Sequence, residues 1–249
     1  MTQGARGFLT RPEILTAGIN LGNPVLAQAG VSATAPKGVS VAIARALAAE
    51  LGVAIEITSF DHASHAFNAV SRGEVDITFL AIDAERAKQV AFSQPYVVIE
   101  GTYLVSNVSL FQSAVDLDSP GRLIASSKGS AYDLHLSRSL KHAKLVDTTG
   151  IDQALAILAE GRVDAVAGVR QALDMALQQR RPGAGRVLAD RFLEIRQAVC
   201  VQKQNAAAVP FIDKVLEKLK ASGILTAALK ESGQVAEVYR SSDHSSVQP

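Results

Sequence analysis

The stretch Thr78–Arg86, with the sequence TFLAIDAER, continues into Val90–Tyr96, VAFSQPY, and is the most informative part of the chain about its fold. The apolar run from Val75 to Leu80 predicts a short buried strand, which a polar loop ending in Arg86 follows. Ligands of open α/β sheets bind beyond the carboxyl ends of the strands, and the rigid guanidinium fork suits a carboxylate or phosphate. Arg86 is therefore either an anion-binding residue or a solvated arginine paired with Glu85 or another nearby acid. Spacing alone favours neither interpretation.

Composition narrows the class of protein. A chain of 249 residues is long enough for one large domain or two small ones. The formal net charge is +1 and no basic block occurs, which argues against nucleic acid as the main partner. No apolar run reaches the roughly 20 residues of a membrane-spanning helix. Cys200 is the only cysteine, which excludes a disulfide or a cysteine metal cluster within one chain.

Two segments of the chain match each other at a constant offset of 88 residues. Residues 66–76, AFNAVSRGEVD, correspond to residues 154–164, ALAILAEGRVD. Each reads as an apolar helix, a glycine at its C-terminus, and Val-Asp leading into a strand. The match predicts two small α/β lobes and not one long sheet; coincidence in an alanine-rich chain is the weaker interpretation.

The motif around Arg86 also resembles the ligand loop of the family 3 extracellular solute-binding proteins, the substrate receptors of polar amino-acid ABC importers. The shared pattern is a strand, x-I-x-x-x-R ending at Arg86, and V-x-F-S-x-P-Y ending at Tyr96, within a likeness that covers almost the whole chain. The resemblance implies an α/β, two-lobed periplasmic binding protein type II fold with two hinge strands. Lobe 1 is expected at residues 1–100 and 198–249, and lobe 2 at residues 101–197.

The resemblance implies a receptor and not an enzyme. We expect a small carboxylate or amino-acid-like ligand, bound between the lobes by hinge closure, with no cofactor or metal. The expected partner is an ABC transporter permease, and the chain is expected to be monomeric and periplasmic. Met1–Pro12 shows no apolar signal region, so either a signal was removed or the protein is cytoplasmic. The alternatives are a prephenate- or arogenate-type dehydratase, with Glu100, Asp83 or Asp61 as general acid, and a sensor module.

The expected carboxylate grip has two halves. In the family, the arginine at the position of Arg86 holds the ligand carboxylate, and the turn corresponding to Gly129 and Ser130 supplies the other half. From the residues alone, a Gly-Ser turn at a helix N-terminus leaves N–H groups for an anion, while Ser130 and Asp133 also fit a capping box. Both can hold together. Ala131 replaces a family hydroxyl, and Tyr132 either closes over the ligand or packs on its own lobe.

Some positions depart from the family pattern. Val169 stands where amino-acid receptors have an aspartate for the ligand ammonium, and Arg170 beside it would favour a second anionic group if it faces inward. Asp83 is the remaining acid for an ammonium. Glu100 either faces the cleft or is a hinge residue bonded to arginine or water, and Asn20 either contacts ligand or caps a turn. The expected ligand-binding set is Asn20, Thr78, Ala81, Asp83, Arg86, Glu100, Gly129, Ser130, Ala131, Tyr132 and Arg170.

Overall fold

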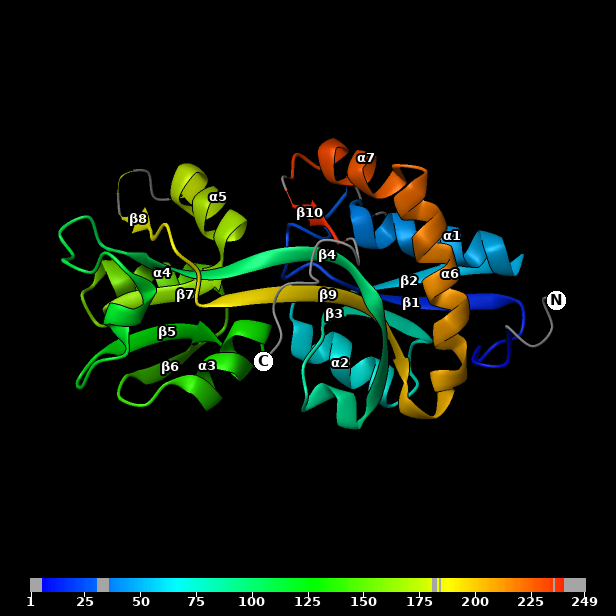
Figure 1. Ribbon diagram of the computed structural model, residues 1–249, viewed down its shortest axis with the longest axis horizontal. Coiled ribbons are helices and arrows are strands. Elements are labelled where there is room, and N and C mark those ends of the chain that lie inside the picture. The colour runs from blue at the N-terminus through cyan, green and yellow to red at the C-terminus, as the bar shows by residue number, and fades with distance from the viewer. Residues whose placement is uncertain (1–5, 31–35, 181–182, 184, 235, 240–249) are drawn as a thin grey trace. The chain divides into compact units, whose positions relative to one another are not determined.

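The computed structural model describes residues 6–30, 36–180, 183, 185–234 and 236–239 (Figure 1). The chain forms two compact units: unit 1 contains residues 1–98 and 196–249, and unit 2 contains residues 99–195. The lobe boundaries expected from the sequence lie two residues from these divisions. None of the helices in the described part is long and apolar enough to span a bilayer.

Unit 1 is built on a largely parallel sheet. Strand β1 (Ile14–Asn20) lies between β2 (Ala54–Phe60) and β3 (Ile77–Ala81), parallel to both, and β9 (Leu193–Gln202) pairs antiparallel with β3. β4 (Val90–Val105) neighbours β9, and β10 (Glu237–Val238) pairs with its residues Val97 and Val98. All five residues of β3 are buried, as expected of a strand covered on both faces.

Helices cover both faces of the unit 1 sheet (Figure 1). On one face, α1 (Val39–Leu51), α6 (Val209–Ala221) and α7 (Ile224–Glu231) pack together, and α2 (Ala63–Ser71) lies on the other. Two short 3-10 helices, η2 (Arg86–Lys88) and η4 (Lys203–Ala208), follow β3 and β9. Helix α1 ends at Gly52, whose φ of 66° is left-handed, as expected of a glycine C-cap.

The strands of unit 2 continue the same hydrogen-bonded sheet. The central strand of this unit, β7 (Ala165–Val169), pairs antiparallel with residues Gly101–Val105 of β4 and parallel with β5 (Leu123–Ser127). Strand β6 (Lys144–Thr148) continues the sheet beside β5, and β8 (Arg186–Val187) pairs with the end of β4. The helices are α3 (Ala131–Ser139), α4 (Ile151–Ala159) and α5 (Arg170–Arg180), with the 3-10 helix η3 (Ala114–Leu117). Strands β4 and β9 run from one unit into the other, so all ten described strands belong to one hydrogen-bonded sheet. The expectation that the chain does not form one long sheet is therefore wrong, although the chain divides into two units.

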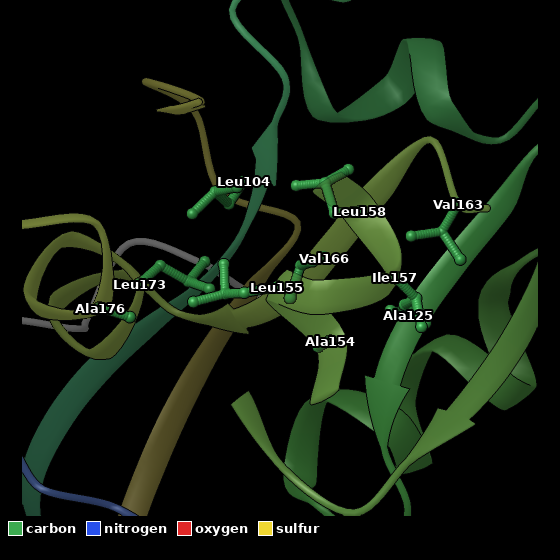
Figure 2. Close-up of a cluster of buried hydrophobic side chains, with 10 residues drawn as sticks. All are labelled: Leu104, Ala125, Ala154, Leu155, Ile157, Leu158, Val163, Val166, Leu173 and Ala176. Atoms are coloured by element: carbon green, nitrogen blue, oxygen red, sulfur yellow. The ribbon is translucent and has the colours of Figure 1, made fainter. Parts of the chain in front are cut away.

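Side-chain alternation divides the unit 2 core into two layers. Leu104 and Val166 face α4 and α5, where they join the cluster of ten buried residues drawn in Figure 2. Their chain neighbours Tyr103 and Ala165 point to the opposite face and pack with Leu136 of α3. Successive strand residues alternate faces, so one short strand supplies both layers.

The repeated segments fold alike. Helix α2 and strand β3 match α4 and β7 residue for residue at the 88-residue offset. Gly73 and Gly161 both adopt left-handed φ values, 73° and 68°. The paired aspartates behave alike too: Asp76 accepts the amide of Thr16, and Asp164 accepts that of Leu123, each at 2.8 Å. Each aspartate thereby ties the start of its strand to the parallel neighbour.

Candidate functional site

Arg86 is buried at the carboxyl end of β3. Only 3% of the residue is exposed, and its Nη1 donates to the carbonyl of Ala81 at 3.2 Å. The loop that carries it is fixed by Asp83, whose Oδ1 accepts the amides of Glu85 at 2.9 Å and Arg86 at 3.3 Å. Glu85 instead forms a surface ion pair with Lys88 at 2.6 Å. The burial of Arg86 contradicts the interpretation that it lies on a solvated face, paired with Glu85 or another nearby acid.

Arg86 is shielded from water. Burial lowers the pKa of its guanidinium, while the nearby Cys200 and Asp83 act in the opposite direction. Cys200 is fully buried in β9, opposite Thr78 of β3, and burial raises the pKa of its thiol to about 12. Arg86 thus holds its charge in a region of low dielectric, where a bound anion interacts with it strongly.

The other unit 1 residues expected at the site have structural contacts. Thr78 is fully buried and its hydroxyl donates to the carbonyl of Gly18 at 2.8 Å. Asn20 accepts the amide of Gly22 at 3.0 Å, which is the turn-capping alternative. Ala81 is buried at the end of β3 and offers its carbonyl to Arg86. Of this group, Asp83 and Arg86 are the ionisable side chains at the strand end.

The Gly-Ser turn of unit 2 forms the N-terminus of α3. Gly129 has a left-handed φ of 73°, and its amide donates to Asp133 at 2.8 Å. The Ser130 hydroxyl accepts the amide of Asp133 at 3.1 Å, so the predicted capping pair is present. The amides of Ala131 and Tyr132 begin the helix and have no acceptor within it. These two amides provide the dipole end at which an anion can bind.

Tyr132 packs on its own unit. It lies against the cluster that includes Tyr103 and Leu136, and burial raises the pKa of its hydroxyl, an effect that Ser130 and Ser127 oppose. This contact corresponds to the second alternative for Tyr132, packing on the lobe.

Arg170 makes its hydrogen bonds inside unit 2. Its Nε donates to Glu100 at 2.7 Å, and its other nitrogens donate to the carbonyls of Leu188, Ala189 and Asp190 at 2.7 to 3.0 Å. Glu100 also pairs with Arg191 at 3.0 Å, and the two arginines, Arg170 foremost, lower the pKa of its carboxyl. Glu100 is thus bonded to two arginines, a contact that the hinge-residue alternative expects. Arg170 anchors the segment before β9, a role that no local sequence pattern predicts.

Sequence reasoning missed Arg191 and this anchoring role. Glu100 and Arg170 are 70 residues apart, and only the β4–β7 pairing of Gly101 with Val169 brings them together. No group of three or more His, Cys, Asp or Glu side chains in the described ranges could hold a metal ion.

With the fold and these contacts defined, comparison with known proteins is informative. The family model for bacterial extracellular solute-binding proteins, family 3, matches residues 17–234. The chain belongs to this family. The predicted fold class is confirmed: the chain has the α/β, type II periplasmic binding protein fold of its family. A search of curated proteins found no match.

Three solved structures illustrate the range of proteins that share the fold. The substrate-binding protein of an amino acid ABC transporter is 24% identical with a TM-score of 0.74, covering 88% of this chain and 98% of its own. A histidine kinase sensor domain is 20% identical with a TM-score of 0.78, covering 92% and 100%. An ancestral amino-acid-binding protein, described as a precursor of cyclohexadienyl dehydratase, is 22% identical with a TM-score of 0.73, covering 88% and 95%.

Proposed function

We propose that this protein is the solute receptor of an ABC importer, and that Arg86 binds the carboxylate of a small carboxylate or amino-acid-like ligand. The observation that carries the proposal is the buried guanidinium of Arg86 at the end of β3, in a loop that Asp83 fixes. The planar guanidinium fork, held in a fixed loop, matches the two oxygens of a carboxylate, so a ligand carboxylate would find a preorganised partner.

The proposed second half of the grip is the N-terminus of α3 in unit 2. The Ala131 and Tyr132 amides would donate to the same carboxylate that Arg86 binds. A ligand held by both units would favour the closed arrangement of a hinged protein, as in other periplasmic binding proteins. If the units close, the radius of gyration measured by solution scattering should become smaller when ligand is added. An unchanged radius would contradict closure.

The ligand class depends on Asp83. Asp83 and Arg86 place a carboxylate and a guanidinium at the same strand end. The carboxylate suits the ammonium group of an amino acid, and the guanidinium suits its carboxylate. Matched pairs of ligands test this: each amino acid is compared by thermal shift with the same acid lacking its amino group. Asp83→Asn keeps an acceptor for the loop amides, so it should weaken binding of the amino acid alone. Equal loss for both members of a pair would remove Asp83 from ammonium recognition.

The test of Arg86 uses the best ligand from that screen in calorimetry. Charge-assisted hydrogen bonds contribute about 1.5–3 kcal/mol, so Arg86→Ala should weaken binding about 10- to 100-fold. Arg72→Ala is the matched control, because Arg72 lies in the same unit with 71% of its side chain exposed. Melting temperatures of both variants separate lost binding from lost folding. Unchanged affinity in a folded Arg86→Ala protein would refute the proposal.

We infer binding and not turnover. Among the candidate general acids, Glu100 is held ionised by Arg170 and Arg191, which disfavours the protonated form that a dehydratase needs. Incubation with prephenate, followed by absorbance of aromatic product, tests the enzyme alternative. The proposed partner is a membrane permease, and the proposed location is outside the cytoplasmic membrane. Stimulation of the ATPase activity of the reconstituted importer by the loaded protein tests the partner.

A further inference from the structure

A cavity of about 290 Å³ opens in unit 2 on the face of the sheet that α3 covers. It is lined by Tyr103 of β4, by His135 and Ser139 of α3, and by residues around η3 and before β9. Ser139 is nine residues beyond Ser130, about 13 Å along the helix axis. On α3 the lining begins at His135, one helical turn beyond Ala131, so the cavity does not include the amides proposed to bind the carboxylate. The cavity volume is near the lower limit of small-molecule pockets.

Tyr103 is the polar group that marks the cavity. The residue is 2% exposed, and its ring packs on Phe192 with centroids 4.5 Å apart. Phe192 in turn stacks with His135, whose ring is inclined by 15°. Within the described part of the chain, no hydrogen-bond partner is found for the Tyr103 hydroxyl. The hydroxyl is not one of the fully enclosed, unpartnered polar atoms of the described residues, so it faces the cavity, where a ligand atom can reach it.

The cavity wall carries net negative charge. Asp118 accepts the amides of residues 141–143 at 2.8 to 3.1 Å, and Asp190 accepts the amide of Ala114 at 2.8 Å. Burial above all, and then the charges of these two carboxylates, raise the pKa of the Tyr103 hydroxyl. Neither carboxylate forms an ion pair with Lys or Arg among the described residues.

The one lining arginine does not offset this charge. Arg191 is paired with Glu100 at 3.0 Å and with Glu194 at 3.5 Å, so its positive charge is already matched by two carboxylates. Apart from His135 and Ser139, the remaining wall is apolar and includes Leu136, Leu140, Phe192 and Val115, which is 77% exposed. The amides of residues 141–143, His142, the Ser113 hydroxyl and the Ala114 amide already stabilise these two carboxylates as anions. An anionic ligand would therefore meet two ionised acids here, whereas a cation with an apolar body would be complementary.

We propose that this cavity is a second binding site, for a small organic ammonium ion with an apolar or aromatic body. The ammonium would donate to Asp118, to Asp190 and to the Tyr103 oxygen. The body of the ligand would lie against Phe192 and the leucines. This site does not depend on the function proposed for Arg86.

The test uses 2-phenylethylammonium as the probe in calorimetry with the full chain. Binding is expected at micromolar to millimolar concentrations and should weaken as salt is raised. The uncharged 3-phenylpropanol and the anionic 3-phenylpropanoate, which have similar bodies, should bind much more weakly, and excess 3-phenylpropanoate should not displace the amine. Equal binding of the amine and the alcohol, or no amine binding, would overturn the proposal.

Two variants locate the site. Tyr103→Phe removes only the hydroxyl and should weaken amine binding about fivefold, the value of one ordinary hydrogen bond. Ser139→Trp fills the cavity mouth and should abolish binding, whereas Ser137→Trp, on an exposed position of the same helix outside the cavity, should not. Unchanged affinity in both Tyr103→Phe and Ser139→Trp would place the amine elsewhere and overturn the assignment.

Discussion

The α2–β3 segment of unit 1 and the α4–β7 segment of unit 2 have the same bounds at an offset of 88 residues, yet their strand ends differ. After β3 comes a loop, and Arg86 is buried five residues beyond Ala81. After β7 the helix α5 begins at once with Arg170, which bonds to Glu100 and to carbonyls of its own unit. The helix and strand of each segment have the same structure, and the residues just after the strand determine which side chains lie at its end and what they bond to.

The two aspartates give the strongest test of how far the two segments are alike. Asp76 is 2% exposed and accepts from the amides and hydroxyls of both Thr10 and Thr16. Asp76→Ala should lower the free energy of unfolding by about 3–4 kcal/mol, since two buried and two partly buried donors lose a charged acceptor. Urea denaturation measures it, with Asp76→Asn as the control that keeps one acceptor. A loss below about 1 kcal/mol would show that the buried network is not stabilising.

The second prediction concerns Arg170, the residue that follows the end of β7 in unit 2. Arg170→Ala removes a partly buried ion pair with Glu100 and the bonds to three carbonyls, and should cost about 2 kcal/mol. Hydrogen exchange should become faster around residues 188–192 and stay unchanged in α2 and β3. Uniformly faster exchange in both units would contradict a local anchoring role.

Asp164 corresponds to Asp76 at the 88-residue offset and should contribute less to the free energy of unfolding. Its side chain is 26% exposed and accepts from the Leu123 amide and from Arg122, so Asp164→Ala should cost about 1.5 kcal/mol. The same urea experiment checks this value beside that for Asp76. If Asp164→Ala were the more damaging change, burial would not be what distinguishes the two copies.

The paired glycines should respond equally. Gly73→Ala and Gly161→Ala each force a side chain into the left-handed region, which costs about 1 kcal/mol. A methyl group at position 73 would approach Gln202 no closer than 3.5 Å, and none of the described atoms near Gly161 would come within 4 Å of one there. Thermal denaturation of both variants should therefore give similar shifts, and a large inequality would reveal packing that the repeat does not share.

The smallest expected effect concerns acid stability. Arg170 and Arg191 lower the pKa of Glu100 in the folded protein below its ordinary value of 4.5. A lowered folded-state pKa stabilises the protein above the unfolded-state pKa, and this contribution disappears as the pH falls through the folded value. Glu100→Gln should therefore make stability less dependent on pH below about 4.5. A profile with the wild-type slope would show that the ion pairs are screened.

Local structure follows from the sequence more closely than the site does. The bounds of β1 (Ile14–Asn20) and α7 (Ile224–Glu231) are readable from alternation and from helical periodicity with a preceding glycine. The apolar run predicts a start for β3 at Val75, two residues too early. The reason is that Asp76 is buried by long-range bonds to Thr10 and Thr16 that no local pattern shows.

The site depends even more on distant contacts. That Arg86 is buried could be suspected from its motif, but the role of Arg170 could not, because its partners lie 18 to 70 residues away. Tyr103 reads as an ordinary strand residue in the sequence. The surroundings of its hydroxyl become visible only when β4, α3 and the segment before β9 are placed together.

Cys200 gives the protein a built-in reporter. It is the sole thiol of the chain and lies fully inside unit 1, with its thiolate form suppressed by burial. A thiol reagent can modify it only in molecules whose unit 1 has opened, so the labelling rate measures how often that half of the protein unfolds. No engineered label is needed, and changes confined to unit 2 should leave the rate unaltered.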